Sequence, residues 1–276
     1  MKLKPVAENQ AEESIKPIYL EIKTTLGLSQ VPLFFQFLGA FPDYLEFIKD
    51  SILNNLNSDK YQDLVKKNQV FVKDIFKENF PKKELWQEFM TKYRLTPEFF
   101  NLKTELDNIF SVNAKLVFVF LSLREAVKGW AVASKKLESH FEQQQQKKTE
   151  DSFFDSQTKT SLIYSTDIIQ TNKEKALTVK DNHGIELALL PKYLELCELE
   201  FNELIKTQAY LFFRVELEKI CLRNLDQLPY PIFSPINLVY KLAQKYPDFP
   251  DLLYLLSEHF PTYAVSRYLF SGYMLY

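Results

Sequence analysis

The chain has 276 residues, 46% of them hydrophobic, and its 34 basic and 36 acidic residues give a formal net charge of −2. That length and apolar content allow the chain to bury a sizeable core. Because there is no surplus of basic residues to neutralise phosphates, the composition argues against a nucleic-acid partner.

The two cysteines, Cys197 and Cys221, stand in no spacing that is typical of a metal site. We therefore expect two structural thiols in a reducing compartment, with neither a metal nor a cofactor. Residues 1–17 carry several charges and no apolar segment, which is unlike a secretory signal peptide. The apolar run Leu116–Leu123 is too short to span a bilayer. The expectation is a cytoplasmic protein with no membrane association.

Helices are expected throughout, because only 5 glycines leave few positions for the positive-φ turns that all-β folds need. Apolar residues spaced three or four apart run from Leu45 to Leu56, and Pro42 stands where it would open that helix. Further along, residues 116–123 are apolar on nearly every side. This pattern predicts the most deeply buried helix of the first half.

Residues 140–174 interrupt the helical pattern with a run of glutamines and mixed charges, which predicts a linker between two units. We expect residues 141–155 to be exposed and mobile, because they hold too little apolar surface to offset their ordering entropy. A second amphipathic pattern runs from Leu194 to Leu204 after Pro191. The tail at 263–276, rich in Tyr and Phe, is expected to be a docked helix.

A short motif occurs twice in the chain. It reads Leu-Gly-Ala-Phe-Pro-Asp-Tyr-Leu-Glu at 38–46 and Leu-Ala-Leu-Leu-Pro-Lys-Tyr-Leu-Glu at 187–195, with five of nine positions identical. A weaker echo relates residues 61–66 to residues 201–206. The chain therefore has the pattern of one duplicated unit.

This duplication predicts an all-α fold of two tandem helical repeats. The repeats are expected at 15–139 and 175–276, joined by the linker at 140–174, with Pro42 superposing on Pro191. Duplicated units usually pack about a pseudo-twofold axis, and the cleft between them is where a ligand site is expected.

The first copy of the motif ends a longer segment, Leu26–Leu45, that resembles the first-half signature of the DehI-type (group I) 2-haloacid dehalogenases. That family also carries Leu-Ala-x-x-Pro-x-Tyr-Leu in both halves. The resemblance implies an all-helical protein of two fused repeats with the active site between them. It also implies hydrolysis of short 2-halocarboxylic acids by direct attack of water on the halogen-bearing carbon, without a covalent ester or a metal. Such a reaction needs a base, a group that aims the water, and a pocket for carboxylate and halide.

The resemblance also implies which residues form the site. The family places a water-orienting Asn in an Asn-Pro-Lys context ahead of an apolar helix, and Asn113 and Lys115 match that context. The alternative role for Asn113 is a helix cap, which Asn fills well. Leu33, within the signature, and Asn182, where the family has a Ser, are expected to contact the substrate.

The expected catalytic base departs from the family pattern. The family's Asp lies eight residues before the repeated proline, and the matching position before Pro191 holds His183. A neutral imidazole can act as a base near neutral pH, since its unperturbed pKa is about 6.5. Asp181, two residues away, would need a local shift of the chain to serve instead. Because the acid is displaced, we expect no robust dehalogenation by the wild-type protein.

Other ionisable residues are expected to be structural. Glu46 and Glu195, which end the two copies of the motif, should be solvated, as should His140 beside the linker. His259 should lie on a helix of the second unit near the aromatic tail. The three histidines are too far apart in sequence to give a metal-binding pattern.

Two classes of function remain open from the sequence. One is a hydrolase of haloacids or related small carboxylic acids, with His183 or Asp181 as base. The other is a non-catalytic helical protein that keeps a small-carboxylate pocket. A third alternative is an adaptor whose aromatic surface binds a protein partner or a second copy of the chain. No G-x-S-x-G, P-loop or H-E-x-x-H motif occurs, which disfavours serine esterases, nucleotide hydrolases and zinc proteases.

Overall fold

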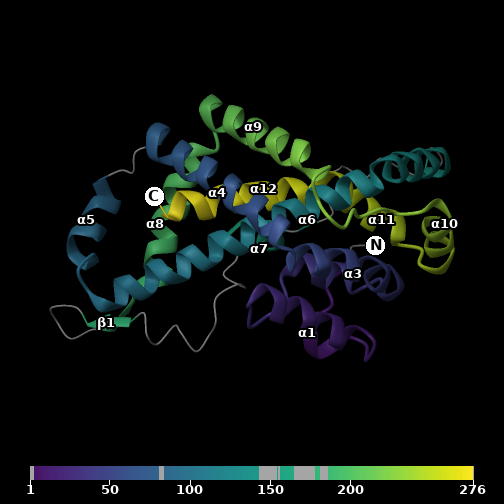
Figure 1. Cartoon of the computed structure of the whole chain (residues 1–276), viewed down its shortest axis with the longest axis horizontal. Helices are drawn as coiled ribbons and strands as arrows, with labels where there is room; N and C mark the ends of the chain where they lie inside the picture. Colours follow the sequence, from purple (N-terminus) through teal and green to yellow (C-terminus); the bar gives the residue numbers. More distant parts are fainter. Residues whose placement is uncertain are drawn as a thin grey trace.

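The computed structural model describes residues 3–80, 84–142, 154, 156–164, 178–180 and 186–275 of the chain. Helices make up nearly all of this described part, which confirms the expected all-α class (Figure 1). After the 3-10 turn η1 (Glu8–Gln10), the helices are α1 (Ile15–Leu26), α2 (Leu33–Leu38), α3 (Pro42–Leu56), α4 (Asp59–Asn79), α5 (Glu84–Tyr93), α6 (Pro97–Glu142), α7 (Ser156–Tyr164), α8 (Leu189–Leu204), α9 (Gln208–Leu225), α10 (Ile236–Lys245), α11 (Phe249–Tyr254), the π-helical η4 (Leu255–His259) and α12 (Phe260–Leu275).

A two-stranded antiparallel ribbon precedes α8. It consists of β1 (Thr178–Lys180) and β2 (Glu186–Ala188), with Val179 opposite Leu187. The sequence pattern does not indicate this ribbon, because each strand has only three residues and β2 runs directly into the apolar start of α8. The ribbon leaves the helical class of the fold unchanged.

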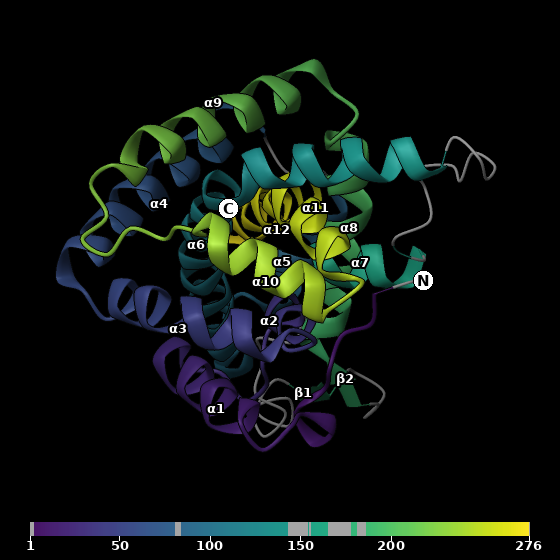
Figure 2. The ribbon, with the colours of Figure 1, turned by 90° about the vertical axis from the view of Figure 1, so that its right-hand side faces the viewer.

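Helices α6 and α12 form the centre of the fold (Figure 1 and Figure 2). Helix α12 packs along α6, and helices α4, α7, α8 and α9 pack around α12. Residues 116–123 of α6 are buried throughout, as predicted, and the tail forms the docked helix α12, which is buried along most of its length. Helices that are apolar all round need such a central position.

By length and composition, Pro97–Lys128 of α6 could cross a membrane, but 78% of its apolar window is buried inside the fold. Packing in the core is enough to account for the apolar character of this helix. The cytoplasmic location stays a prediction.

Proline stands in the first turn of the two helices that carry the repeated motif. Pro42 is the first residue of α3, and Pro191 is the third residue of α8, where the missing N–H costs no helical hydrogen bond. Each of these helices is followed by a second helix, a shorter helix and a long core segment. After α3 these are α4, α5 and α6, and after α8 they are α9, α10 and the run from α11 to α12. The weaker sequence similarity between residues 61–66 and residues 201–206 does not fit this succession of helices. Residues 61–66 lie on α4, whereas residues 201–206 run past the end of α8.

The repeated motif places its side chains alike in α3 and α8. Tyr44 and Tyr193 are both buried. Glu46 and Glu195 are both exposed, as expected, and each pairs with a lysine three residues away on its own helix. The motif therefore has the same pattern of buried and exposed side chains in both helices.

Phe154, inside the predicted linker, is buried. Its ring centroid lies 6.1 Å from that of Phe260 and 6.0 Å from that of Tyr263. The expectation that residues 141–155 are exposed is therefore wrong at Phe154, while residues 143–153 and 155 lie outside the described residues. The prediction rested on the polar composition of the segment and gave too little weight to its phenylalanines, each of which can bury about 150–250 Å².

Gly272 allows α12 to approach α4 and α6 closely. A Cβ at this position would lie 2.6 Å from Cγ1 of Val72 and 3.2 Å from the rings of Phe76 and Phe110. We expect Gly272→Ala to lower the free energy of unfolding by about 1–2 kcal/mol, because the cost of overpacking exceeds the gain in helix propensity. Urea unfolding followed by circular dichroism measures this difference. An unchanged free energy of unfolding would show that the core adjusts without cost.

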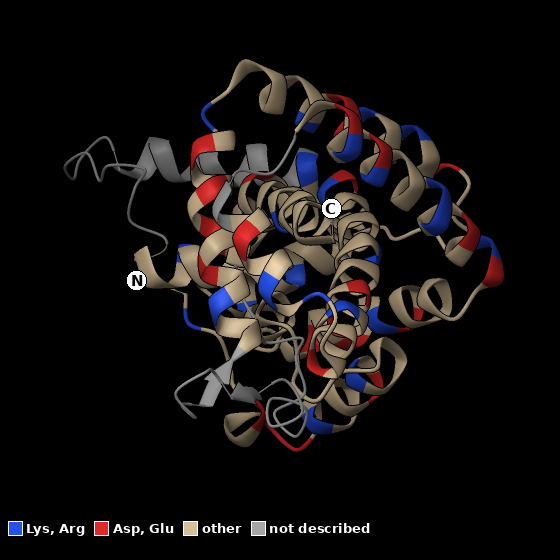
Figure 3. Ribbon diagram, turned by 90° about the vertical axis from the view of Figure 1, so that its left-hand side faces the viewer, with Lys and Arg blue, Asp and Glu red and all other residues tan. Residues whose placement is uncertain are grey.

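Charged side chains are interspersed over the outer helices. Figure 3 shows both basic and acidic residues along the outer helices. This distribution agrees with the formal net charge of −2. The absence of a nucleic-acid partner stays a prediction.

Candidate functional site

Asn113 lies in the core, where α6 packs against α12. Its side chain is 2% exposed, and its Oδ1 accepts a hydrogen bond of 2.8 Å from Nε of Arg267 on α12. Because α6 begins at Pro97, Asn113 lies in the interior of a helix, and the alternative role as a helix cap is wrong. An amide at this depth needs a polar partner, and here that partner is a cation.

Arg267 is an arginine buried in the core, with 1% of its surface exposed. The carbon of its guanidinium lies 6.0 Å from the ring centroid of Phe34, within range of a cation–π interaction. Burying a guanidinium is costly unless charges and hydrogen bonds compensate, so Arg267 marks a candidate site. Sequence reasoning missed it, although Arg267 is the one charged residue in the aromatic tail at 263–276.

Three phenylalanines build an aromatic wall next to this pair. Phe34 comes from α2, Phe120 from α6 and Phe260 from α12. The ring of Phe34 lies 4.6 Å from that of Phe120 and 5.5 Å from that of Phe260, measured between centroids. Helices α2, α6 and α12 therefore meet around the ring of Phe34, which faces Arg267.

The structure places only some of the residues predicted for the site. Leu33 is the first residue of α2, directly before Phe34, and it packs against the core while partly exposed. Asp181, Asn182 and His183 lie outside the described residues. That they meet Asn113 stays a prediction.

Lys115, the matched lysine of the motif, connects α6 to α4. Its backbone carbonyl accepts a hydrogen bond of 2.6 Å from the hydroxyl of Tyr61. Burial raises the pKa of Tyr61 well above its usual value, so the phenol stays a neutral donor. Burial lowers the pKa of the Lys115 ammonium. This hydrogen bond attaches α6 to α4 at Lys115, two residues from Asn113.

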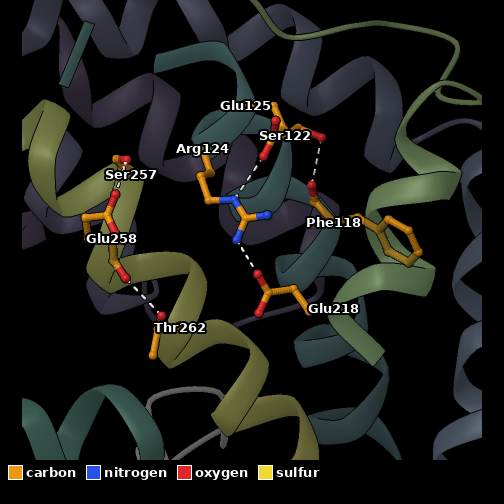
Figure 4. Close-up of polar contacts among 8 residues, drawn as sticks. All are labelled: Phe118, Ser122, Arg124, Glu125, Glu218, Ser257, Glu258 and Thr262. Carbon is orange, nitrogen blue, oxygen red and sulfur yellow. Dashed lines mark hydrogen bonds and ion pairs between the residues drawn. The ribbon is translucent and has the colours of Figure 1, made fainter. Parts of the chain in front are cut away.

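The π-helical segment Leu255–His259 lies just before the helix that carries Arg267. π-helical segments are rare in proteins, and a large share of those that occur lie at functional sites. The hydroxyl of Thr262 donates to the carbonyl of Glu258 at 2.9 Å, and the hydroxyl of Ser257 donates to its carboxylate at 2.7 Å (Figure 4). His259 lies on a helix near the aromatic tail, as predicted.

A second arginine, Arg124, lies further along α6. It donates from Nε to Glu125 at 3.0 Å and from Nη1 to Glu218 on α9 (Figure 4). Two carboxylates therefore compensate the charge of Arg124 and tie α6 to α9. Arg267 likewise joins two helices, since its Nε donates to Asn113 on α6.

Within the described part of the chain, no group of three or more His, Cys, Asp or Glu is placed to hold a metal ion. Cys197 and Cys221 are both buried. Burial raises the pKa of Cys221 to about 12, so this sulfur is a neutral thiol at physiological pH. Both positions suit the structural role expected of them.

No family model and no curated protein matches this chain. Among solved structures, the complex of a D-2-haloacid dehalogenase mutant with D-2-CPA has a TM-score of 0.69 at 14% identity, covering 99% of this chain and 94% of that one. The complex of D-2-haloacid dehalogenase with L-LA has a TM-score of 0.68 at 14% identity, covering 99% and 95%. The resemblance seen in the sequence is thereby confirmed at the level of the fold, over nearly the full length.

Proposed function

We propose that this chain binds a short 2-substituted carboxylic acid where α6 packs against α12 and acts on it as a haloacid-dehalogenase-like hydrolase. The observation that carries the proposal is the buried pair of Asn113 and Arg267. Asn113 is the residue that the resemblance assigns to the attacking water, and Arg267 adds a cation beside it. The fold shared with D-2-haloacid dehalogenases supports the same function.

Arg267 is suited to receive the carboxylate of the substrate. A guanidinium presents five N–H donors in a planar fork that matches a carboxylate, and the bond from Nε to Asn113 fixes the plane of that fork. The attraction is stronger in the core than in water, because the local dielectric constant is lower. The rings of Phe34 and Phe260 offer apolar surface for the alkyl part of a short acid.

Asn113 is suited to hold the attacking water. Its Oδ1 accepts from Arg267, so its amide nitrogen is the atom that donates to the water oxygen. The water oxygen attacks C2 on the side opposite the halogen, a C–O bond forms, and the halogen leaves as halide with the electron pair of the broken bond. The base, His183 or Asp181, takes the proton, and the product is a 2-hydroxy acid of inverted configuration.

The proposal includes two repeats related by a pseudo-twofold axis, with the ligand between them. Two hydrogen bonds support this arrangement. Tyr44 of the first repeat shares one of 2.9 Å with Ser234 of the second, and Tyr193 of the second accepts one of 3.1 Å from Nε1 of Trp86 in the first. The two tyrosines hold the same position in the repeated motif, so each reaches the opposite repeat in the same way. The packing of α4 on α12 and of α6 on α9 is reciprocal as well.

A non-catalytic carboxylate-binding protein is the second candidate, and the histidine at the position of the family's Asp favours it. Chloride release from D- and L-2-chloropropionate, measured beside calorimetric binding of D- and L-lactate, decides between the two. Release of more than one chloride per protein molecule supports the hydrolase. We expect this release to be slow, because the family's catalytic Asp is not at its usual position. Lactate binding without chloride release supports the non-catalytic candidate. If the protein neither binds lactate nor releases chloride, both candidate functions are wrong.

Asn113→Ala is expected to lower the rate of chloride release on the order of tenfold to thousandfold, as loss of one aligned hydrogen bond in a transition state does. Asn68→Ala is the matched control, since Asn68 is an equally buried amide that donates to Cys221. Both variants should lose stability, by about 1–3 kcal/mol. Only Asn113→Ala should lose rate; a parallel loss of rate in both variants would show that Asn113 acts through stability alone.

A further inference from the structure

A cavity of about 250 Å³ lies at the end of α4, between α8 and α12. Its lining includes Phe80, Glu200, Glu203, Thr207 and Tyr273, and it does not include Asn113 or Arg267. A cavity of about 150 Å³ holds benzene. This one therefore admits a ligand of one ring with a short chain.

Glu200 brings a carboxylate into the wall of this cavity. The residue is 8% exposed, and its Oε2 accepts a hydrogen bond from the hydroxyl of Tyr273. Burial, together with the hydrogen bond and charge of Glu200, raises the pKa of Tyr273, so its hydroxyl stays a neutral donor. The carboxylate is thereby held in one orientation.

Two aromatic rings stand beside this carboxylate. Phe80 lies 5.6 Å from Phe76 and 5.4 Å from Phe213, and Tyr273 lies 5.8 Å from Phe76, measured between ring centroids. Their neighbours fix both rings in place. A carboxylate next to aromatic rings is the combination that recognises an ammonium ion.

The backbone around the cavity also favours a cation. Helix α4 ends at Asn79 and α8 ends at Leu204, and both residues line the cavity. Helix C-termini carry partial negative charge. The start of α9 lies there too, but its N–H at Tyr210 already donates to the capping hydroxyl of Thr207 at 3.2 Å.

We propose that this cavity binds a small primary ammonium ion of the arylalkylamine class. The ammonium group donates to the carboxylate of Glu200, and the ring packs against Phe80 and Tyr273. This site is separate from the one at Arg267 and prefers the opposite charge. It therefore stands whether or not the chain hydrolyses haloacids.

Calorimetric titration with benzylamine, benzyl alcohol and benzoate tests the proposal. Benzylamine should bind at least about tenfold more tightly than the isosteric alcohol, because a charge-assisted hydrogen bond is stronger than a neutral one. Benzoate should not bind in this cavity, so its titration is carried out on Arg267→Met to remove the anion site. Equal affinity for the amine and the alcohol, or no binding of the amine, would overturn the proposal.

Glu200→Gln keeps the shape of the side chain and an oxygen for the hydroxyl of Tyr273. It should weaken benzylamine at least about tenfold and leave the alcohol unchanged. Glu195→Gln is the matched control, since Glu195 is exposed on the same helix, pairs with Lys192 and is not part of the cavity lining, and it should change the affinity less than about twofold. If Glu200→Gln does not fold, Phe80→Leu gives the same test through loss of the ring. Unchanged benzylamine affinity in a folded Glu200→Gln or Phe80→Leu variant contradicts the assignment.

Discussion

Arg267→Met is expected to weaken the binding of lactate, the product of 2-chloropropionate hydrolysis, by at least about thirtyfold, because loss of one partner of a desolvated charge pair costs about 2 kcal/mol or more. In the proposed site, the guanidinium supplies the positive charge that faces the substrate carboxylate. Asn113 and Phe34 hold this guanidinium through a hydrogen bond and a ring contact. Isothermal titration with D- and L-lactate measures the loss.

The same substitution should leave the fold intact. Methionine is apolar and unbranched, and replacing a buried cation by an apolar side chain is often neutral or stabilising. Asn113 loses the donor to its Oδ1, which costs about 1–3 kcal/mol. We therefore expect the free energy of unfolding to change by less than about 2 kcal/mol in either direction.

Two further variants sharpen this test. Arg124→Met removes another cation from the core region of α6, where Glu125 and Glu218 compensate it, and should leave lactate affinity unchanged. Arg267→Lys keeps the charge but not the planar fork, so its affinity should fall between those of wild type and Arg267→Met. Wild-type affinity in Arg267→Met, or an equal loss in Arg124→Met, would place the carboxylate elsewhere.

If His183 is the base, His183→Ala is expected to abolish chloride release from 2-chloropropionate while lactate still binds, because in the proposed site the carboxylate is held by Arg267. Only the neutral imidazole accepts the proton of the water. The rate should therefore be low in acid, rise with pH and level off above an ionisation within about one or two units of pH 6.5. Initial rates between pH 4 and pH 9, at about saturating substrate, give this profile.

Asp181→Asn separates the two candidate bases. With His183 as base, Asp181→Asn should have a mild effect and keep the same pH profile. With Asp181 as base, the effects of the two variants are reversed, and the ionisation moves toward the usual carboxyl pKa of about 3.9. Full activity in both variants would exclude both residues. Lactate binding with no chloride release by the wild-type protein would establish the non-catalytic candidate.

The helical class and the start of α3 could be predicted from the sequence because they depend on neighbouring residues. The spacing of Leu45, Ile48, Ile52 and Leu56 defines one apolar face, and Pro42 fits the first turn of a helix. Asn113 could be named from the local context of a family motif. Its position inside α6 could not, because the boundary of α6 depends on how a long helix packs, and not on the residues next to Asn113.

Long-range packing decided the rest of the candidate site. The hydrogen bond between Asn113 and Arg267 joins residues 154 positions apart, and no local pattern specifies such a partner. The burial of Phe154 depends in the same way on Phe260, which belongs to a distant helix. The sequence by itself determined the helical class and the apolar faces of helices such as α3 and α8, because periodicity and proline act within a few residues. It did not indicate helix α7, which lies inside the predicted linker at 140–174. Only the tertiary structure decided which polar groups the core brings together, because that pairing arises when helices from both halves pack against each other.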